Sequence, residues 1–142
     1  MSRPMTRQER EEFVAGLHVG VLAVADEDAR GPLALPISYA YEPGGEVRFM
    51  TGRANRKASL MEVGTRVSFC AQNEGLPYQY VAVEGPVVAI DPASAGERRA
   101  IAARYLGPEG AEAWLAGTAD AAPDMVIFRV RPERWRTQDF SE

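Results

Sequence analysis

Short apolar runs of strand character, joined by links of only a few residues, constrain the fold of this chain most. The first three runs are Val19–Ala25, Leu33–Tyr41 and Glu46–Gly52. In the middle run every second residue is apolar or aromatic, which is the period of a strand with one buried face. The links between these runs carry Asp, Gly and Pro and are too short for the crossover that parallel strands need. The three runs therefore predict an antiparallel meander.

Further strands follow in the second half of the chain. Arg66–Gln72, Tyr78–Ile90 and Met125–Val130 have strand composition, and Trp135–Phe140 extends or pairs with the last of them. Gly85-Pro86 interrupts the longest run. Because proline cannot donate to a ladder, this dipeptide predicts a bulge, a bend or an edge.

Capping signals predict short helices beside the strands. Thr6 and Glu9 have the spacing of a capping box, and Gly16 follows as a stop. Asn55 begins a later helix, as does Asp91-Pro92. In chain order the predicted helices cover residues 7–15, 55–61, 92–106 and a short stretch from residue 108. We expect residues 118–123 to form a flexible connector.

Length and composition favour a single domain over residues 1–142. The chain is 46% hydrophobic and shows no internal repeat. A chain of this size buries roughly 68–70% of the surface that it exposes when unfolded, so one core suffices without disulfides or a structural metal. About six strands and three or four short helices predict a mainly β fold, an antiparallel barrel with helices on its outside.

Cysteine content and charge pattern restrict the cellular compartments in which this chain is expected. Cys70 is the only cysteine, so no intramolecular disulfide and no cysteine-based zinc site can form. The mixed charges of the first twelve residues do not fit a secretory signal or transit peptide. Val19–Ala25, the longest strongly apolar run, is far shorter than the ~20 residues of a membrane helix. We expect a soluble, cytoplasmic protein with no metal and no membrane partner.

A local reversal of charge is the strongest chemical signal in the sequence. Between Val47 and Met61 there are four cations and no acid, although the net charge of the chain is −4. These cations are Arg48, Arg53, Arg56 and Lys57. The last three follow a strand and begin a helix, where free N–H groups and the helix dipole favour an anion. Any one of them alone fits a solvated cation, but together they predict a site for a compact phosphate ester. A single basic segment in an acidic chain argues against nucleic acid as the partner.

The order of several motifs resembles a known family. Gly20–Val24, an acidic turn, Pro32–Tyr41 and Phe49–Lys57 together resemble the split β-barrel flavin and deazaflavin enzymes related to pyridoxamine 5′-phosphate oxidase. Later segments are similar to the branch of that family labelled F420-dependent; they are Pro77–Gly85, Ala103–Gly107 and Val126–Arg134. The resemblance implies an FMN-binding-protein-like split β-barrel over nearly the whole chain.

The resemblance also implies where a cofactor would lie. In that family two chains form a dimer and hold the cofactor in a groove between them. The residues implied to hold the cofactor phosphate are Thr51, Arg53, Arg56 and Lys57. Backbone around Pro36, Ile37 and Ser38 would face the flavin-like ring. Gln79, with Tyr78 and Tyr80, would border the ring or the facing subunit. The C-terminal segment has no histidine to match the vitamin B6 site of the oxidases proper, so vitamin B6 oxidation is not expected.

The expected activity requires few catalytic side chains. A flavin or deazaflavin transfers the hydride itself, and the protein positions it and excludes water. We therefore assign no catalytic residue, and expect His18 and Cys70 to be structural. Tyr39 and Tyr41 are expected in the core or a dimer interface, while Glu84 fits a groove acid and a solvated residue equally well.

F420 and FMN share a ring, a ribityl arm and a phosphate, so both fit the same cations. F420 also carries a polyglutamate tail, which additional cations near the phosphate would bind, so the four cations slightly favour F420 over FMN. We predict a homodimeric oxidoreductase that transfers a hydride between F420 or FMN and a small unsaturated or aromatic substrate. The alternative is a non-catalytic carrier of flavin, F420 or haem.

Overall fold

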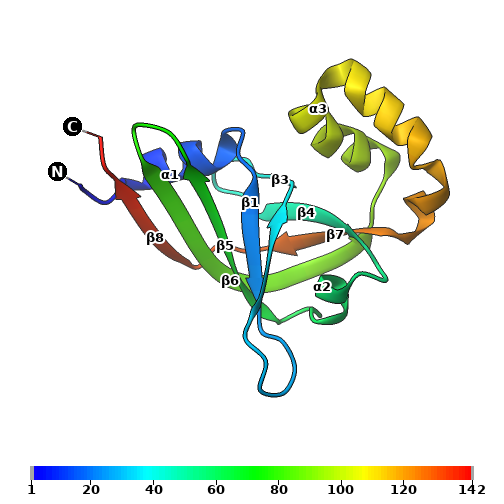
Figure 1. The fold of residues 1–142 in the computed structure, drawn as a ribbon, viewed down its shortest axis with the longest axis horizontal. Helices are drawn as coiled ribbons and strands as arrows, with labels where there is room; N and C mark the ends of the chain where they lie inside the picture. Colours follow the sequence, from blue (N-terminus) through cyan, green and yellow to red (C-terminus); the bar gives the residue numbers. More distant parts are fainter. Residues whose placement is uncertain (1, 142) are drawn as a thin grey trace.

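Eight antiparallel strands form one sheet that curls into a barrel in this computed structural model, which describes residues 2–141 (Figure 1). The strands are β1 (Gly20–Val24), β2 (Leu33–Ile37), β3 (Tyr39–Ala40), β4 (Val47–Gly52), β5 (Arg66–Asn73), β6 (Gln79–Pro92), β7 (Met125–Val130) and β8 (Arg134–Asp139). Their order in the sheet is β2-β1-β5-β6-β7-β4-β3, and β8 pairs with β6. The predicted mainly β fold, an antiparallel split barrel with outer helices, is confirmed.

The run Leu33–Tyr41 is not the single strand that its period predicts. Its first half, β2, pairs with β1, and its second half, β3, pairs with β4. Only Ser38 separates the two strands, so the first and last strands of the sheet order meet at this residue. Alternation along a strand reports which face is buried and carries no information about the neighbouring strand. The sequence pattern therefore could not show this change of partner.

β6 bends where the sequence places Gly85-Pro86. Before the bend it pairs with β5 and β8, and beyond it with β7, where the register shifts between Val87 and Ala89. A Cβ atom at Gly85 would lie 1.7 Å from the carbonyl oxygen of Arg131. Only glycine therefore allows the connection from β7 to β8 to pass so close. The predicted bend is confirmed, and it joins two halves of the barrel.

Four helical segments lie outside the barrel: α1 (Arg7–Ala15), α2 (Arg56–Ser59), α3 (Ala95–Gly117) and the 3-10 helix η1 (Ala119–Asp124). α1 begins with the predicted capping box, in which Thr6 and Glu9 satisfy each other's backbone N–H groups. α2 is a single turn, shorter than the predicted helix 55–61. The predicted flexible connector 118–123 is largely η1. Within residues 2–141, every helix falls short of the length or apolarity that a membrane crossing requires.

α3 starts later than predicted. Asp91 and Pro92 remain in β6, opposite Ile127 and Val126, so they cannot open the helix. Ser94 caps it instead, in a second capping box. The break predicted at residue 107 is confirmed, because Gly107 has a φ of 75° and turns the chain before the second helical segment.

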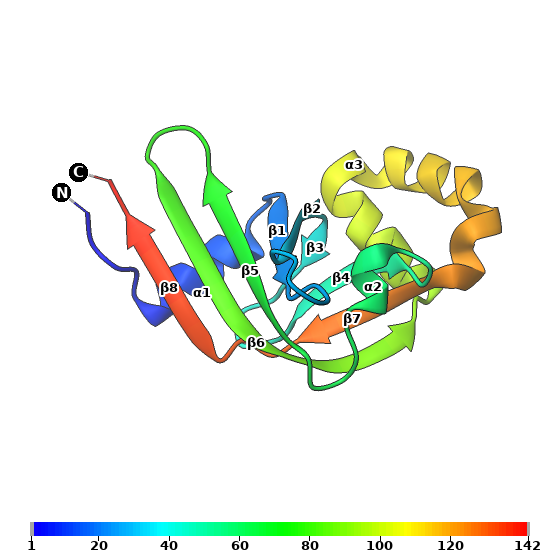
Figure 2. The same ribbon diagram turned by 60° about the horizontal axis from the view of Figure 1, so that its bottom comes forward.

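The barrel interior is the main core. Phe49 stacks on Phe128 with ring centroids 5.4 Å apart, and Tyr39 meets Phe69 edge-on at 4.6 Å. Tyr39 and Tyr41 are both buried in the core, which is one of the two placements predicted for them. A smaller cluster lies outside the barrel, where α3 covers β4 and β7 (Figure 2). Its members are Ala40, Ile101 and Ile127, with Met50 and Tyr105 packed against them.

Candidate functional site

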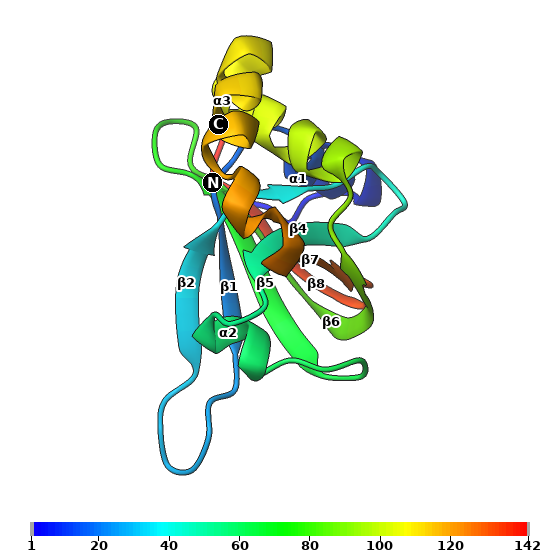
Figure 3. The ribbon, with the colours of Figure 1, turned by 90° about the vertical axis from the view of Figure 1, so that its right-hand side faces the viewer.

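Three of the four predicted cations lie at or just before α2, which is beside the end of β1 and the start of β2 (Figure 3). We call Arg53, Arg56 and Lys57 the α2 cations. Arg56 pairs with Asp26, which follows β1. The backbone N–H of Glu27, and then Arg56, hold the pKa of the Asp26 carboxyl below its ordinary value. Asp26 belongs to the loop between β1 and β2. The absence of acids in the segment between Val47 and Met61 therefore could not show that a carboxylate lies beside Arg56.

The remaining α2 cations are less engaged. Lys57 is half-buried and Arg53 is exposed, and neither side chain forms an ion pair within residues 2–141. Arg53 is anchored by its backbone N–H, which donates to the carbonyl oxygen of Asp124 at 2.7 Å. Arg48, the fourth predicted cation, is separate because it pairs with Glu42 at 2.8 Å on the outer side of β4. Among the described ion pairs, Asp26 is thus the one acid that engages an α2 cation, while Glu27 and Glu62 line a hollow beside the end of α2.

Thr51 supports the turn that carries the α2 cations. Its side chain is buried, and its hydroxyl oxygen accepts a hydrogen bond from the Asn55 side chain at 2.8 Å. Asn55 makes no side-chain cap to α2, contrary to the prediction, because its amide is engaged with Thr51. Thr51 and Asn55 therefore fix the path of the chain between β4 and α2.

An apolar sheet face extends from the α2 cations across four strands, and we call it the uncovered face. The register places two rows of outward-pointing residues side by side on β2, β1, β5 and β6. The row nearer α2 holds Ala34, Ala23, Ser68 and, on β6, Glu84, and the next holds Pro36, Val21, Cys70 and Ala82. Small and apolar side chains make this surface flat.

A hollow of about 650 Å³ lies at the far end of the uncovered face. Its lining residues include Leu17, His18, Val19, Pro36 and Cys70. Leu17 and Val19 are 62% and 60% exposed. Such contiguous apolar exposure marks an interaction or ligand surface more often than ordinary solvent-facing surface.

Cys70 and His18 both border this hollow. Cys70 is half-buried and points outward, because Phe69 and Ala71 on either side point into the core. Burial raises the pKa of its thiol, which keeps it protonated and unreactive. His18 stacks on Phe13 with ring centroids 4.3 Å apart, and burial lowers its pKa. Neither side chain has the partners of a nucleophile or a general base.

Arg104 and Tyr105 position the hollow, and sequence reasoning assigned them no role. The Arg104 guanidinium donates to the carbonyl oxygens of Tyr39 at 2.9 Å and Gly16 at 3.0 Å. The Tyr105 hydroxyl donates to the carbonyl oxygen of His18 at 2.7 Å. Both residues lie in the segment 103–107. The sequence signal for a structural role was an arginine among the apolar residues of a predicted helix.

The ring-facing residues predicted on β2 divide between two environments. Pro36 is exposed on the uncovered face, and Ser38 is exposed where β2 gives way to β3. Ile37 is only 6% exposed because its side chain enters the core. Ile37 can therefore face a ligand through its backbone alone.

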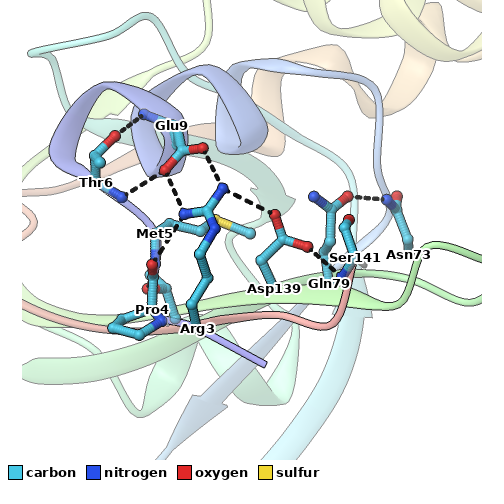
Figure 4. A network of polar contacts seen from close by, with 10 residues as sticks. Arg3, Pro4, Met5, Thr6, Glu9, Asn73, Gln79, Asp139 and Ser141 are labelled. Atoms are coloured by element: carbon cyan, nitrogen blue, oxygen red, sulfur yellow. Dashed lines mark hydrogen bonds and ion pairs between the residues drawn. The ribbon is translucent and has the colours of Figure 1, made fainter. Parts of the chain in front are cut away.

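Gln79 lies away from the α2 cations. Its side-chain oxygen accepts from Asn73 at 2.8 Å, in the network that also joins Arg3, Glu9 and Asp139 (Figure 4). Asn73 ends β5 and α2 precedes its start, so the length of β5, ~23 Å, separates Gln79 from α2. Within one chain, Gln79 and the α2 cations cannot contact the same phosphate.

Glu84, on this side of the sheet, belongs to an ion-pair cluster. Glu84 is half-buried on the outer side of β6 and accepts from Arg66 at 3.1 Å. Arg66 also pairs with Glu133 at 2.8 Å. No three His, Cys, Asp or Glu side chains in residues 2–141 converge as metal ligands. The distinctive chemistry of the site is thus cationic and apolar.

The family profile of pyridoxamine 5′-phosphate oxidase matches residues 6–139. The chain therefore belongs to this family. Its fold is similar to that of an F420 reductase, with 25% identity, a TM-score of 0.73, and coverage of 89% of this chain and 94% of that one. It is also similar to a FAD-binding protein from Mesorhizobium loti, at 23% identity, a TM-score of 0.69 and 99% of both chains.

A conserved hypothetical protein from Mycobacterium tuberculosis is also similar, with 24% identity, a TM-score of 0.75, and coverage of 96% of this chain and 86% of that one. The likenesses below 25% identity support the fold alone. A search of curated proteins finds no match.

Proposed function

We propose that this protein is a homodimeric oxidoreductase that transfers a hydride between bound F420 or FMN and a small unsaturated or aromatic substrate. The observation that carries the proposal is the position of the α2 cations at one end of the uncovered face. Asp26, which pairs with Arg56, lies at the cationic end of the face, and Val21 lines the apolar hollow at the other end. Along the chain through β1, these two residues are ~17 Å apart. A cofactor with a phosphate at the end of a ribityl arm and a flat ring suits this separation.

The α2 cations fit the phosphate of such a cofactor. Lys57 and Arg53 supply donors that no described carboxylate engages, and Arg56 shares Asp26. Charge-assisted hydrogen bonds are the stronger class, and a fork of donors from arginine suits a phosphate. A phosphate would relieve the concentration of positive charge that Asp26 balances only in part.

The uncovered face fits the ring. Pro36, Val21 and Cys70 form a flat apolar row with exposed backbone nearby at Ser38. A planar ring can lie against such a surface, and backbone groups can hydrogen-bond to its edge. The role of the protein would be to hold the ring, exclude water and leave room for a substrate.

A second copy of the chain is the partner that we propose for this face. Leu17 and Val19 are largely exposed, and Val21 is 41% exposed. Contiguous apolar exposure of this kind is typical of an interface. Gln79, distant from α2 in its own chain, could then border a cofactor held mainly by the other subunit.

Family membership supports a redox role. One of the similar structures is an F420 reductase, and another is a FAD-binding protein. Hydride transfer by a cofactor requires no catalytic triad or carboxylate pair from the protein. The single cysteine supports a reducing compartment, and we place the activity in the cytoplasm.

Spectrophotometric titration with FMN and with F420, followed by turnover of each reduced cofactor with a panel of acceptors, tests the proposal. We expect one cofactor to bind at micromolar concentration or better and to be reoxidised by an unsaturated or aromatic acceptor. Binding without turnover over a broad panel would identify a carrier instead. Absence of binding by both would contradict the proposal.

Charge reversal tests the phosphate site. Arg56→Glu and Lys57→Glu should each weaken cofactor binding at least about thirtyfold, because each removes a charge-assisted bond and adds repulsion. Arg99→Glu is the matched control, because Arg99 lies exposed on α3 and pairs with Glu112. Equal affinity of all three variants would rule out the α2 cations as the phosphate site.

A further inference from the structure

A second hollow lies between α1, the β3–β4 turn and the start of β8, and has a volume of about 300 Å³. It is on the other side of the sheet from the uncovered face. Trp135, which lines it, stands opposite the buried Val83, whereas the neighbouring Ala82 and Arg136 point outward. The two sites therefore do not share a surface. The charged and aromatic lining residues are Arg7, Arg10, Glu11, Tyr41, Arg131, Glu133 and Trp135.

Arg10 is the central group of this hollow. Its guanidinium lies 4.4 Å from the centroid of the Trp135 ring. Its Nε atom is buried without a hydrogen-bond partner, and within residues 2–141 the side chain forms no ion pair. A buried donor without a partner costs free energy comparable to a lost hydrogen bond. The fold therefore holds the Arg10 guanidinium against an aromatic ring with its buried Nε donor unpaired.

The two acids of the hollow pair with two of its own arginines. Glu11 accepts from Arg7 at 3.1 Å. Glu133 accepts from both Arg131 at 3.0 Å and Arg66 at 2.8 Å. Arg7 and Arg131 thus face carboxylates, and Arg10 is the lining arginine that forms no ion pair within residues 2–141, in a chain whose net charge is −4. The Tyr41 hydroxyl accepts from the backbone N–H of Gly44 at 3.3 Å, so its own proton remains to be donated.

We propose that this hollow binds a small organic anion, through a carboxylate or phosphoryl group that accepts from Arg10, Arg131 and Tyr41. Arginine forks match both kinds of oxyanion, and the desolvated position of Arg10 over an aromatic ring strengthens such bonds. The volume is at the lower end for small-molecule sites, which limits the ligand to a few carbon atoms. This site is independent of the proposed cofactor site.

Tryptophan fluorescence tests the proposal directly. The chain has two tryptophans, and Trp114→Phe leaves Trp135 as the only reporter. The probes are inorganic phosphate and citrate, added at constant ionic strength against sodium chloride. We expect one probe or both to change the emission of Trp135 with saturation at about 0.1–5 mM. Saturation by citrate alone assigns a carboxylate ligand, and saturation by phosphate alone assigns a phosphoryl ligand.

Variants of the lining arginines establish the site. In the Trp114→Phe background, Arg10→Leu should weaken binding at least about tenfold, because the stem still packs on Trp135 while the donors are lost. Arg131→Gln changes an exposed side chain, so it keeps the test valid if Arg10→Leu does not fold. Arg56→Gln, in the α2 cations, is the control and should leave the titration unchanged.

Three results would overturn the proposal. The first is a change in emission that sodium chloride reproduces, and the second is no saturation by either probe below about 20 mM. The third is unaltered affinity in folded Arg10→Leu or Arg131→Gln protein.

Discussion

The barrel has two apolar outer faces, and the described chain covers only one of them. On β4 and β7, Met50 and Ile127 point outward and α3 packs over them, so Ile127 is 1% exposed. On β1 and β2, Val21 and Pro36 point outward in the same way, but Val21 is 41% exposed. A sheet whose strands carry apolar residues on both faces is stable when both faces are covered by other parts of a protein. One face receives its cover from the chain itself, and the other is the face on which we propose that a second copy and a cofactor bind.

Val21→Asp is the change with the largest expected effect on this comparison. A charge in the middle of the uncovered face should weaken dimerisation by about a hundredfold or more, because an unpaired carboxylate would be buried in the interface. Cofactor affinity should fall with it. Analytical ultracentrifugation over a range of protein concentrations measures the first effect.

Val63→Asp is the matched control, because Val63 is an exposed valine outside the uncovered face, at 63% exposure. It should remain dimeric. If Val21→Asp and Val63→Asp have the same dissociation constant as the parent, the uncovered face is not the interface.

Ile127→Ala tests the covered face. It should lower the free energy of unfolding by about 2–5 kcal/mol, because it leaves a cavity beneath α3. Val21→Ala, measured in dilute monomeric protein, should change it by less than about 0.5 kcal/mol. Urea denaturation of both variants gives the two values. Similar losses would mean that the two faces are equally buried in the monomer.

His18 provides the smallest and most specific test, at the edge of the uncovered face. Burial, opposed by backbone hydrogen bonds and aided by Arg104, lowers its pKa below the ordinary 6.5. The unfolded chain then binds the proton more readily than the folded one. The stability contributed by neutral His18 is therefore fully present above pH 6.5 and decreases as the pH falls below it. Because the ring is partly exposed, we expect a decrease in Tm of no more than about 3 °C between pH 7.5 and 5.5.

His18→Gln should remove that part of the pH dependence. Thermal unfolding of parent and variant at both pH values measures the difference. A parent whose Tm is higher at pH 5.5 would contradict the sign. The proposed dimer would bury His18 further, so on that proposal the decrease should be larger at protein concentrations that favour the dimer.

The strands and the capping boxes could be predicted because they depend on neighbours in the chain. Met125–Val130 is β7 to the residue, and Thr6 with Glu9 caps α1 as their spacing indicates. Residues 33–41 could not be predicted as two strands, because the change of partner at Ser38 depends on where β1 and β4 lie. The same holds for Asp91 and Pro92, which pairing with β7 keeps in β6.

The candidate site divides in the same way. The excess of cations around residues 53–57, which predicts a site for a phosphate ester, is a property of the sequence, and so is the family resemblance that implies a cofactor phosphate there. Asp26 on Arg56, the separation of Gln79 from α2, and Arg10 over Trp135 each join segments far apart in the chain. No spacing rule reports such pairs.

By itself, the sequence determined the alternation of the strands, the helix starts that rely on local hydrogen bonds, and the charge carried by each segment. Only the tertiary structure decided which apolar face α3 covers and which stays open, and which charges meet. The physical reason is that local conformation depends on residues a few positions apart, whereas burial and ion pairing depend on strands brought together by the barrel.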